Sequence, residues 1–136
     1  THGDLLGEQP DLVGLRLAPD PPSNRESLLQ AHEILSLDLP AADLVVLSAC
    51  SSGLGQRDLG EGIVGLPRAF FSAGARSVAV SLWPVADQKA ASFMVSFYRE
   101  LLATPNDKAG ALQRAKLANP TRPDIWAPFI LLGTPR

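Results

Sequence analysis

The 136-residue chain has one cysteine, two histidines and few aromatic residues, and these scarcities exclude several classes of protein. A single cysteine cannot form an internal disulfide, which suits a reducing compartment. One cysteine and two histidines far apart in sequence do not make a zinc site, so we expect no metal. The net charge of −2, with no basic run, argues against a nucleic-acid-binding surface.

Long apolar runs and targeting segments are also missing. No stretch approaches the roughly 18 apolar residues of a membrane span, and the first residues lack the charged and apolar regions of a signal peptide. We therefore expect a cytoplasmic protein without membrane contact. Residues 53–55 form a Gly-x-Gly, but the further glycine or Lys-Ser/Thr of a phosphate-binding loop does not follow. We expect no cofactor.

The chain does contain enough apolar material for a core. Hydrophobic residues make up 46% of a length that suits one domain. The pattern of apolar runs and breakers predicts loop over residues 1–11 and then alternating elements. Strands are expected over residues 12–18, 26–30, 44–48, 77–82 and 126–132, and helices over 31–37, 63–73, 88–103 and 107–118. This order favours an α/β fold with parallel βαβ connections.

Two of the predicted helices carry more detailed expectations. Pro67 lies inside the helix at 63–73, and proline is tolerated only in a first turn, so that helix is expected to begin near Leu66. In the helix at 88–103, four large apolar residues are expected on one buried face. These are Phe93, Phe97, Tyr98 and Leu101.

The single cysteine lies where an open α/β sheet presents reactive groups. Cys50 follows the apolar run 44–47 through a serine and an alanine, and a segment rich in glycine and serine comes next. Such sheets carry their chemistry beyond the carboxyl ends of the strands. His2, placed 48 positions earlier (50 − 2), would supply the base for a thiol nucleophile. The alternative is that Cys50 is a small buried hydrophobe, as cysteines often are.

Five short motifs, taken in order, resemble the CHAT domain. They are His2-Gly3 and the segments 43–50 (DLVVLSAC), 60–62 (GEG), 81–87 (SLWPVAD) and 126–129 (WAPF). CHAT domains are caspase-like cysteine peptidases related to separases, and they are often attached to tetratricopeptide repeats. The resemblance implies a caspase-like α/β/α sandwich with a mostly parallel sheet, whose first strands precede the His-Gly motif. Residues 1–136 are therefore expected to be the C-terminal part of one CHAT domain.

The resemblance also implies roles for individual residues. Cys50 would be the nucleophile, and His2 would act as base and then protonate the leaving amine. The amides of Gly3 and Cys50 would stabilise the oxyanion, although Gly3 also suits an ordinary turn. Asp87 would line the specificity pocket and pair with a basic side chain of the substrate. It would equally suit the cap of the helix expected at 88, and both roles are compatible.

Three more residues are candidates for substrate binding, each with a structural alternative. Glu61 would help to recognise a basic side chain or would only order its loop. Ser51 would shape the floor of the pocket or only turn the chain. Trp83 would form a wall of the pocket or only pack. His32, on a short predicted helix, is expected to face solvent and is given no role.

These features together predict a cysteine endopeptidase that cuts a partner protein after a basic residue. A second hypothesis is a catalytically silent scaffold or signalling module with the same fold, although the intact His2/Cys50 pair speaks against it. A third is an inactive fragment that requires an upstream segment. The expected partners are a protein substrate and an upstream segment or tetratricopeptide-like repeat region that completes or regulates the fold.

Overall fold

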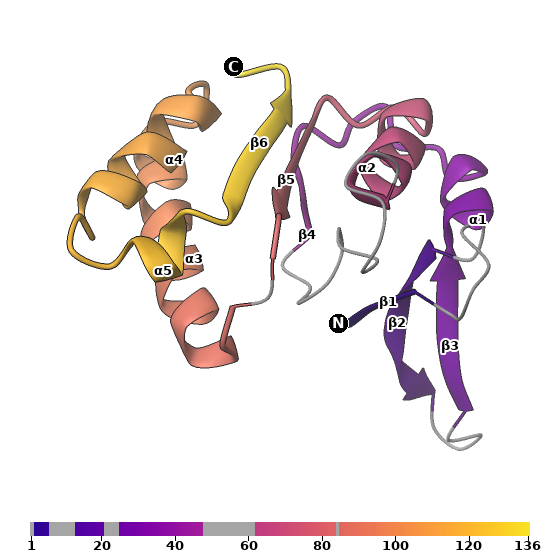
Figure 1. Cartoon of the computed structure of the whole chain (residues 1–136). Coiled ribbons are helices and arrows are strands. Elements are labelled where there is room, and N and C mark those ends of the chain that lie inside the picture. Colours follow the sequence, from indigo (N-terminus) through magenta and orange to yellow (C-terminus); the bar gives the residue numbers. More distant parts are fainter. Residues whose placement is uncertain (1, 6–12, 21–24, 48–61, 84) are drawn as a thin grey trace.

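The computed structural model describes residues 2–5, 13–20, 25–47, 62–83 and 85–136. Within these ranges the chain forms two three-stranded sheets, ordered β1-β2-β3 and β4-β5-β6, and five helices (Figure 1). The strands are β1 (His2–Leu5), β2 (Val13–Asp20), β3 (Arg25–Gln30), β4 (Val45–Leu47), β5 (Ser77–Ser81) and β6 (Phe129–Gly133). The helices are α1 (Ala31–Leu35), α2 (Gly62–Ser72), α3 (Asp87–Ala103), α4 (Lys108–Leu117) and α5 (Pro123–Trp126).

The sheet of β4, β5 and β6 lies between two groups of helices, with α1 and α2 on one side and α3, α4 and α5 on the other (Figure 1). Successive side chains of a strand point to opposite faces, and β6 follows this rule. Ile130 and Leu132 pack into the core that contains α1 and α2. Phe129 and Leu131 pack into the core of α3 and α4. Both faces of the sheet are therefore covered by apolar side chains.

The direction of the strands agrees with the sequence prediction only in part. β4 and β5 are parallel and joined through α2, as a βαβ connection requires. β6 is antiparallel to β5, with Ser77 opposite Gly133 and Ser81 opposite Phe129. The fold is thus α/β with a mixed sheet, in which the parallel connection predicted from the order of elements joins β4 to β5 and the last strand runs the other way.

The apolar face predicted for the long helix is largely confirmed. Phe93 and Phe97 of α3 are buried, and the Phe93 ring stacks on Phe129 with 4.8 Å between ring centroids. Leu101 is partly buried against the same core. Tyr98 is instead exposed. One residue is a turn of about 100° in a helix, so Tyr98 is rotated away from the face of its neighbour Phe97.

Residues 2–5 correct the expectation that the chain starts with a loop. They form β1, which pairs antiparallel with β2, and β2 pairs antiparallel with β3. The four residues of β1 include a glycine and an aspartate and show no alternating apolar pattern, so pairing with β2 decides their conformation. Leu15 and Leu29 join this sheet to the core beneath α1 and α2.

Two further boundaries differ from the prediction. α2 begins at Gly62, not near Leu66, and contains Pro67 as its sixth residue. Only the first four N–H groups of a helix have no partner within it, so Pro67 costs α2 one intrahelical hydrogen bond, that of its own missing N–H. The last strand begins at Phe129 and not at 126, because Pro123–Trp126 form α5. Proline is favoured in the first helical position, which Pro123 occupies.

Candidate active site

The candidate site lies at the edge of the second sheet where β4 and β5 end. Val45 is paired with Val78 and Leu47 with Val80, so the two parallel strands leave the sheet at the same edge. Cys50 follows the end of β4 by three positions and lies outside the described residues. The segment after β5 carries Trp83 and leads into α3. Two of the predicted site segments are thus continuations of neighbouring parallel strands.

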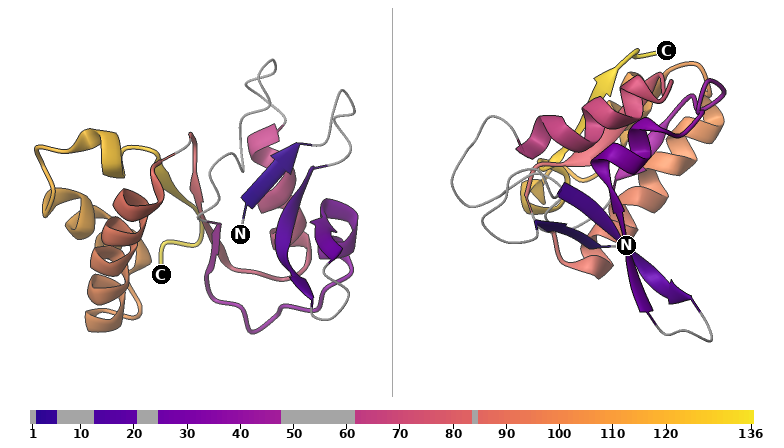
Figure 2. Two further views of the ribbon diagram at one scale, coloured as in Figure 1. Left: turned by 90° about the horizontal axis from the view of Figure 1, so that it is seen from below. Right: turned by 90° about the vertical axis from the view of Figure 1, so that its right-hand side faces the viewer.

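The first strand of the chain begins on the same side of the molecule. In Figure 1 the start of β1 and the carboxyl ends of β4 and β5 all lie toward the lower side, which the left panel of Figure 2 shows from below. His2 is the first residue of β1 and is paired with Arg16, and Gly3 is paired with Leu15. The structure therefore places the backbone of His2 and Gly3 in a strand on the side of the molecule where β4 and β5 end.

Two described hydrogen bonds hold Leu82 and Trp83, the residues that follow β5. The Ser81 hydroxyl donates to the Trp83 carbonyl over 2.6 Å. The Leu82 N–H donates to the Pro128 carbonyl over 2.9 Å. The Trp83 side chain is 40% exposed, so part of its ring is accessible beside the end of β5.

Asp87 occupies a different position in its helix from the predicted one. α3 begins at Asp87 itself, and the N-cap residue is Ala86. Asp87 is therefore in the first turn and is not the residue before the helix. A carboxylate there is favoured by the positive end of the helix dipole. The side chain is exposed, as a group that binds substrate would be.

The remaining predicted site residues lie where the structure gives no description. Cys50, Ser51 and Glu61 are outside the described residues, and their roles stay predictions. His32 is exposed on α1, as expected. In the part of the chain that the structure describes, no three histidine, cysteine, aspartate or glutamate residues are grouped to hold a metal ion.

The first turn of α3 is attached to α5 by an ion pair. Lys89 Nζ lies 3.1 Å from Asp124 Oδ2, and Arg122 Nε lies 3.2 Å from Asp124 Oδ1. The hydrogen bonds from Arg122, and then from Lys89, lower the pKa of Asp124 from 3.8 to about 2. The carboxylate is therefore ionised well into the acid range and holds the helix start that carries Asp87.

This ion pair predicts a pH dependence of stability. A carboxyl whose pKa is lowered on folding stabilises the native state above its unfolded pKa, and the contribution is lost as the pH falls. For Asp124 the loss is expected between pH 3.8 and about 2. In Asp124→Asn the urea concentration at the midpoint of unfolding should fall less steeply over this pH range than in the parent chain. The control is Asp38→Asn, an exposed aspartate between α1 and β4. The same dependence of the urea midpoint on pH in the two variants would contradict the prediction.

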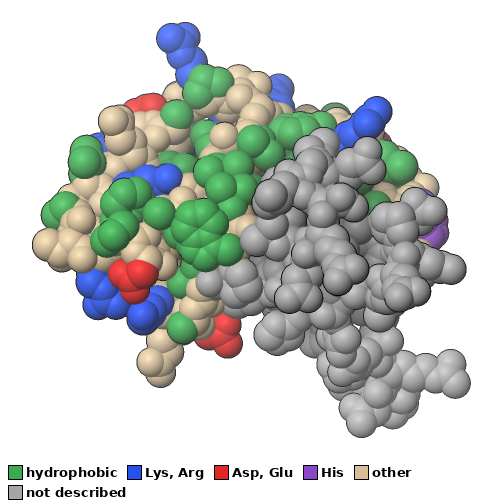
Figure 3. Space-filling model, viewed as in Figure 1, with side chains coloured by type: hydrophobic (Ala, Val, Ile, Leu, Met, Phe, Trp, Pro, Cys, Tyr) green, Lys and Arg blue, Asp and Glu red, His purple; other side chains and the backbone are tan. Residues whose placement is uncertain are grey.

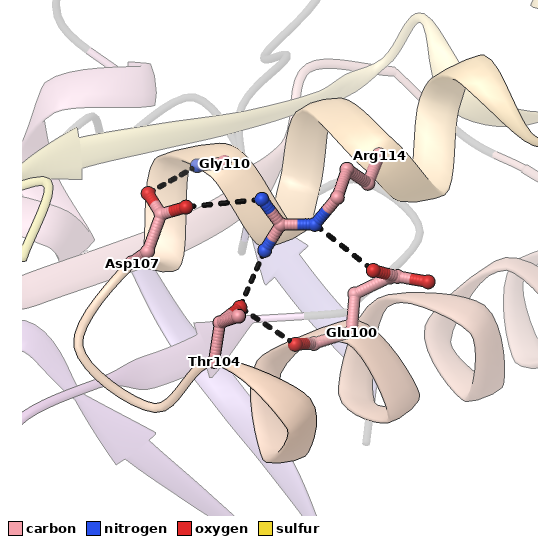
Figure 4. A network of polar contacts seen from close by, with 5 residues as sticks. All are labelled: Glu100, Thr104, Asp107, Gly110 and Arg114. Carbon is pink, nitrogen blue, oxygen red and sulfur yellow. Dashed lines mark hydrogen bonds and ion pairs between the residues drawn. The ribbon is translucent and has the colours of Figure 1, made fainter.

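The opposite end of α3 is joined to α4 by a polar network (Figure 4). The Arg114 guanidinium donates to Glu100 Oε2 over 2.9 Å, to Asp107 Oδ2 over 3.0 Å and to the Thr104 hydroxyl. Asp107 also caps α4 by accepting the Gly110 N–H over 2.9 Å. These bonds, led by that of Arg114, lower the pKa of Asp107. The network fixes the turn between the two helices and lies away from the candidate site.

A buried lysine, which the sequence analysis did not single out, joins α4 to the start of β4. The Lys108 side chain is 1% exposed, and its Nζ lies 2.8 Å from Asp43 Oδ2. The same ammonium donates to the Arg136 carbonyl. One sequence signal was available, because Lys108 belongs to the stripe that α4 buries, together with Ala111, Leu112 and Ala115. A lysine in such a stripe needs a partner of opposite charge.

The surface around the site is mixed in character. Figure 3 shows apolar side chains next to the atoms drawn in grey, and charged side chains of both signs elsewhere on the same face. No helix among the described residues has both the length and the apolar character needed to cross a membrane.

Comparison with known proteins agrees with the motifs. A family model of the CHAT domain matches residues 1–134. Tetratricopeptide repeat protein 28 of Mus musculus and its namesake of Homo sapiens are each 36% identical to this chain over 138 residues, which cover 98% of it. The chain spans 6% of the length of these relatives. Because the family match runs over essentially the whole chain, this protein belongs to the CHAT domain family.

Proposed function

We propose that this chain is the catalytic part of a cysteine endopeptidase that cuts a partner protein after a basic residue. The CHAT domain is a cysteine-peptidase-like family, and the residues that peptidase chemistry needs are present. The observation that supports the proposal is that three segments carrying its residues lie on the same side of the molecule. These are the start of β1 with His2, the end of β4 before Cys50, and the segment after β5 with Trp83 and Asp87.

The proposed reaction is acyl transfer in two steps. His2 takes the proton of the Cys50 thiol, and Sγ attacks the scissile carbonyl carbon. The backbone amides of Gly3 and Cys50 donate to the oxyanion. When the intermediate collapses, the C–N bond breaks, the imidazolium gives its proton to the leaving amine, and a thioester remains. Water, deprotonated by His2, then attacks the thioester, and the acid product and the free thiol are released.

Recognition of a basic side chain is proposed for the segment that follows β5. The exposed carboxylate of Asp87 would form a charge-assisted hydrogen bond with an arginine or lysine of the substrate. The exposed part of the Trp83 ring would form a wall of the pocket. Glu61 and Ser51 are proposed as further contacts from the segment after Cys50.

We further propose that the complete domain is a caspase-like α/β/α sandwich, of which residues 1–136 are the C-terminal part. β4 pairs with β5 on one side, and no described strand pairs with its other side. Strands preceding His2 would extend the sheet there. An upstream repeat region, of the kind that the relatives' name describes, would complete or regulate the site. The thiol chemistry fits the reducing cytoplasm.

A second candidate function is a silent scaffold or signalling module with the peptidase fold. It is favoured by one finding: the name of the two curated relatives describes a repeat protein and not an enzyme. Such a module would use the same surface to bind a protein without cleaving it.

Labelling with an arginyl acyloxymethyl ketone, followed by intact mass, tests the first proposal against the second. We expect rapid modification of the parent chain, none of Cys50→Ala, and slower modification of Asp87→Ala. The control is Asp38→Ala, an exposed aspartate remote in sequence from the proposed pocket. Loss of labelling in Cys50→Ala but not in Asp87→Ala would support a peptidase and would exclude Asp87 from substrate recognition. A parent chain that stays unlabelled, even with its upstream segment restored, would favour the scaffold.

A further inference from the structure

Two buried serines stand at the two ends of β5, and each forms the same kind of hydrogen bond. Ser77 is fully buried, and its hydroxyl donates to the Thr134 carbonyl over 2.7 Å. Ser81 is 5% exposed, and its hydroxyl donates to the Trp83 carbonyl over 2.6 Å. Only Ser81 lies at the end of the strand that faces the candidate site. The chain therefore contains a functional candidate and a matched structural control on one strand.

The bond of Ser81 acts on a short segment with fixed ends. On one side the Leu82 N–H is bonded to the Pro128 carbonyl. On the other side Val85 is buried in the core of α3, where it belongs to the same cluster as Ala90 and Phe129. Trp83 lies between these two attachments and is partly exposed. The orientation of its carbonyl is thus set by a side chain that is almost wholly buried.

We infer that Ser81 is a positioning residue for substrate recognition, holding the Trp83 carbonyl and so fixing the orientation of Trp83 after β5. The inference rests on the function proposed above, since it assigns a cause to the shape of the same pocket. Ser81 does not itself contact substrate. It acts through the carbonyl two residues further along the chain.

The physical reason is the cost of a carbonyl that loses its partner. With alanine at position 81 the Trp83 carbonyl loses the hydroxyl that donates to it, and the peptide group is free to turn toward water or another donor. A turn there would move the indole. Ser77→Ala removes an equally buried hydroxyl at the far end of β5, so it tests the general effect of losing such a bond.

The kinetic test compares Ser81→Ala with Ser77→Ala in the full chain. For an arginyl peptide we expect Ser81→Ala to raise KM by about three- to tenfold with kcat changed less than about twofold, because uniform binding is lost. Ser77→Ala should leave both constants unchanged. Ser81→Thr, which keeps the hydroxyl, should restore KM. Equal effects of the two alanine variants on KM, or no effect of Ser81→Ala, would overturn the inference.

A second measurement does not depend on catalysis. In a Trp126→Phe background the tryptophan fluorescence comes from Trp83 alone, since the chain has two tryptophans. Acrylamide quenching of Trp83 should increase in Ser81→Ala and stay unchanged in Ser77→Ala. If the chain cleaves nothing yet quenching responds in this way, the proposed function fails and the restraint on Trp83 stands. Unchanged quenching in Ser81→Ala would overturn the restraint, whatever the activity.

Discussion

Replacing Asp43 with alanine will lower the free energy of unfolding by about 3–5 kcal/mol, whereas replacing Lys108 with methionine will change it by about 1 kcal/mol or less. The two residues form one ion pair, with 2.8 Å between Nζ and Oδ2. The expected asymmetry comes from their unequal burial. The Lys108 side chain is 1% exposed, and that of Asp43 is 53% exposed.

Asp43→Ala leaves an ammonium group inside the protein with a backbone carbonyl, that of Arg136, as its described acceptor. Removing one partner of a buried pair is costly because the other charge keeps its desolvation penalty. Lys108→Met removes the buried charge and keeps most of the volume of the side chain. The carboxylate that it leaves behind is half in water and needs no protein partner.

Urea unfolding of the two single variants and of the double variant measures the asymmetry. Once the buried ammonium is absent, the loss of Asp43 should cost little, so the double variant is expected to be close to Lys108→Met. The change in unfolding free energy of the double variant, minus the sum of the changes in the two single variants, gives the coupling energy of the pair. Equal losses in the two single variants would contradict the argument from burial, because they would mean that the ammonium is as well solvated as the carboxylate.

The ion pair is also relevant to the site, because Asp43 comes two residues before β4. Lys108 is the first residue of α4, so the pair attaches that helix to the segment leading into the strand. β4 in turn precedes Cys50. A loosened pair would therefore disturb the start of the strand whose other end leads to the predicted nucleophile.

The elements that the sequence predicted well are those whose signal is local. The run at 77–82 is apolar throughout its centre and bounded by breakers, and β5 occupies 77–81. The helix at 88–103 has a 3.6-residue apolar period, and α3 differs from it by one residue. β1 was missed because its conformation depends on pairing with β2, residues 13–20. The direction of β6 depends on how three helices return the chain, which periodicity does not encode.

For the candidate site too, the residue types could be predicted from the sequence, whereas their arrangement in space could not. Residue types and motif order identified His2, Cys50 and Asp87 as candidates, because chemistry restricts which side chains suit each role. The position of β1 on the side of the molecule where β4 and β5 end is a tertiary property and needed the structure. Ser81 was not found because its partner is a backbone carbonyl. Residue identity says little about which carbonyl a hydroxyl will meet.

The sharpest consequence of the proposed dyad concerns His2. His2→Ala should slow labelling of Cys50 at neutral pH by about 10²–10⁴-fold, the usual contribution of a positioned acid–base group. The matched control is His32→Ala, since His32 is the other histidine of the chain and is exposed on α1. Its replacement should leave the labelling rate unchanged.

The pH profile separates a chemical role of His2 from a structural one. A free thiol has a pKa near 8.5 and is mostly protonated at neutral pH. With an imidazole to accept its proton, the parent chain should react fast below that pH. In His2→Ala the rate should instead rise with pH up to about 8.5, as for an unassisted thiol. A variant that is merely misfolded would not recover at high pH. If His2→Ala and His32→Ala react at the same rate throughout, the dyad is excluded and the scaffold becomes the better account of the fold.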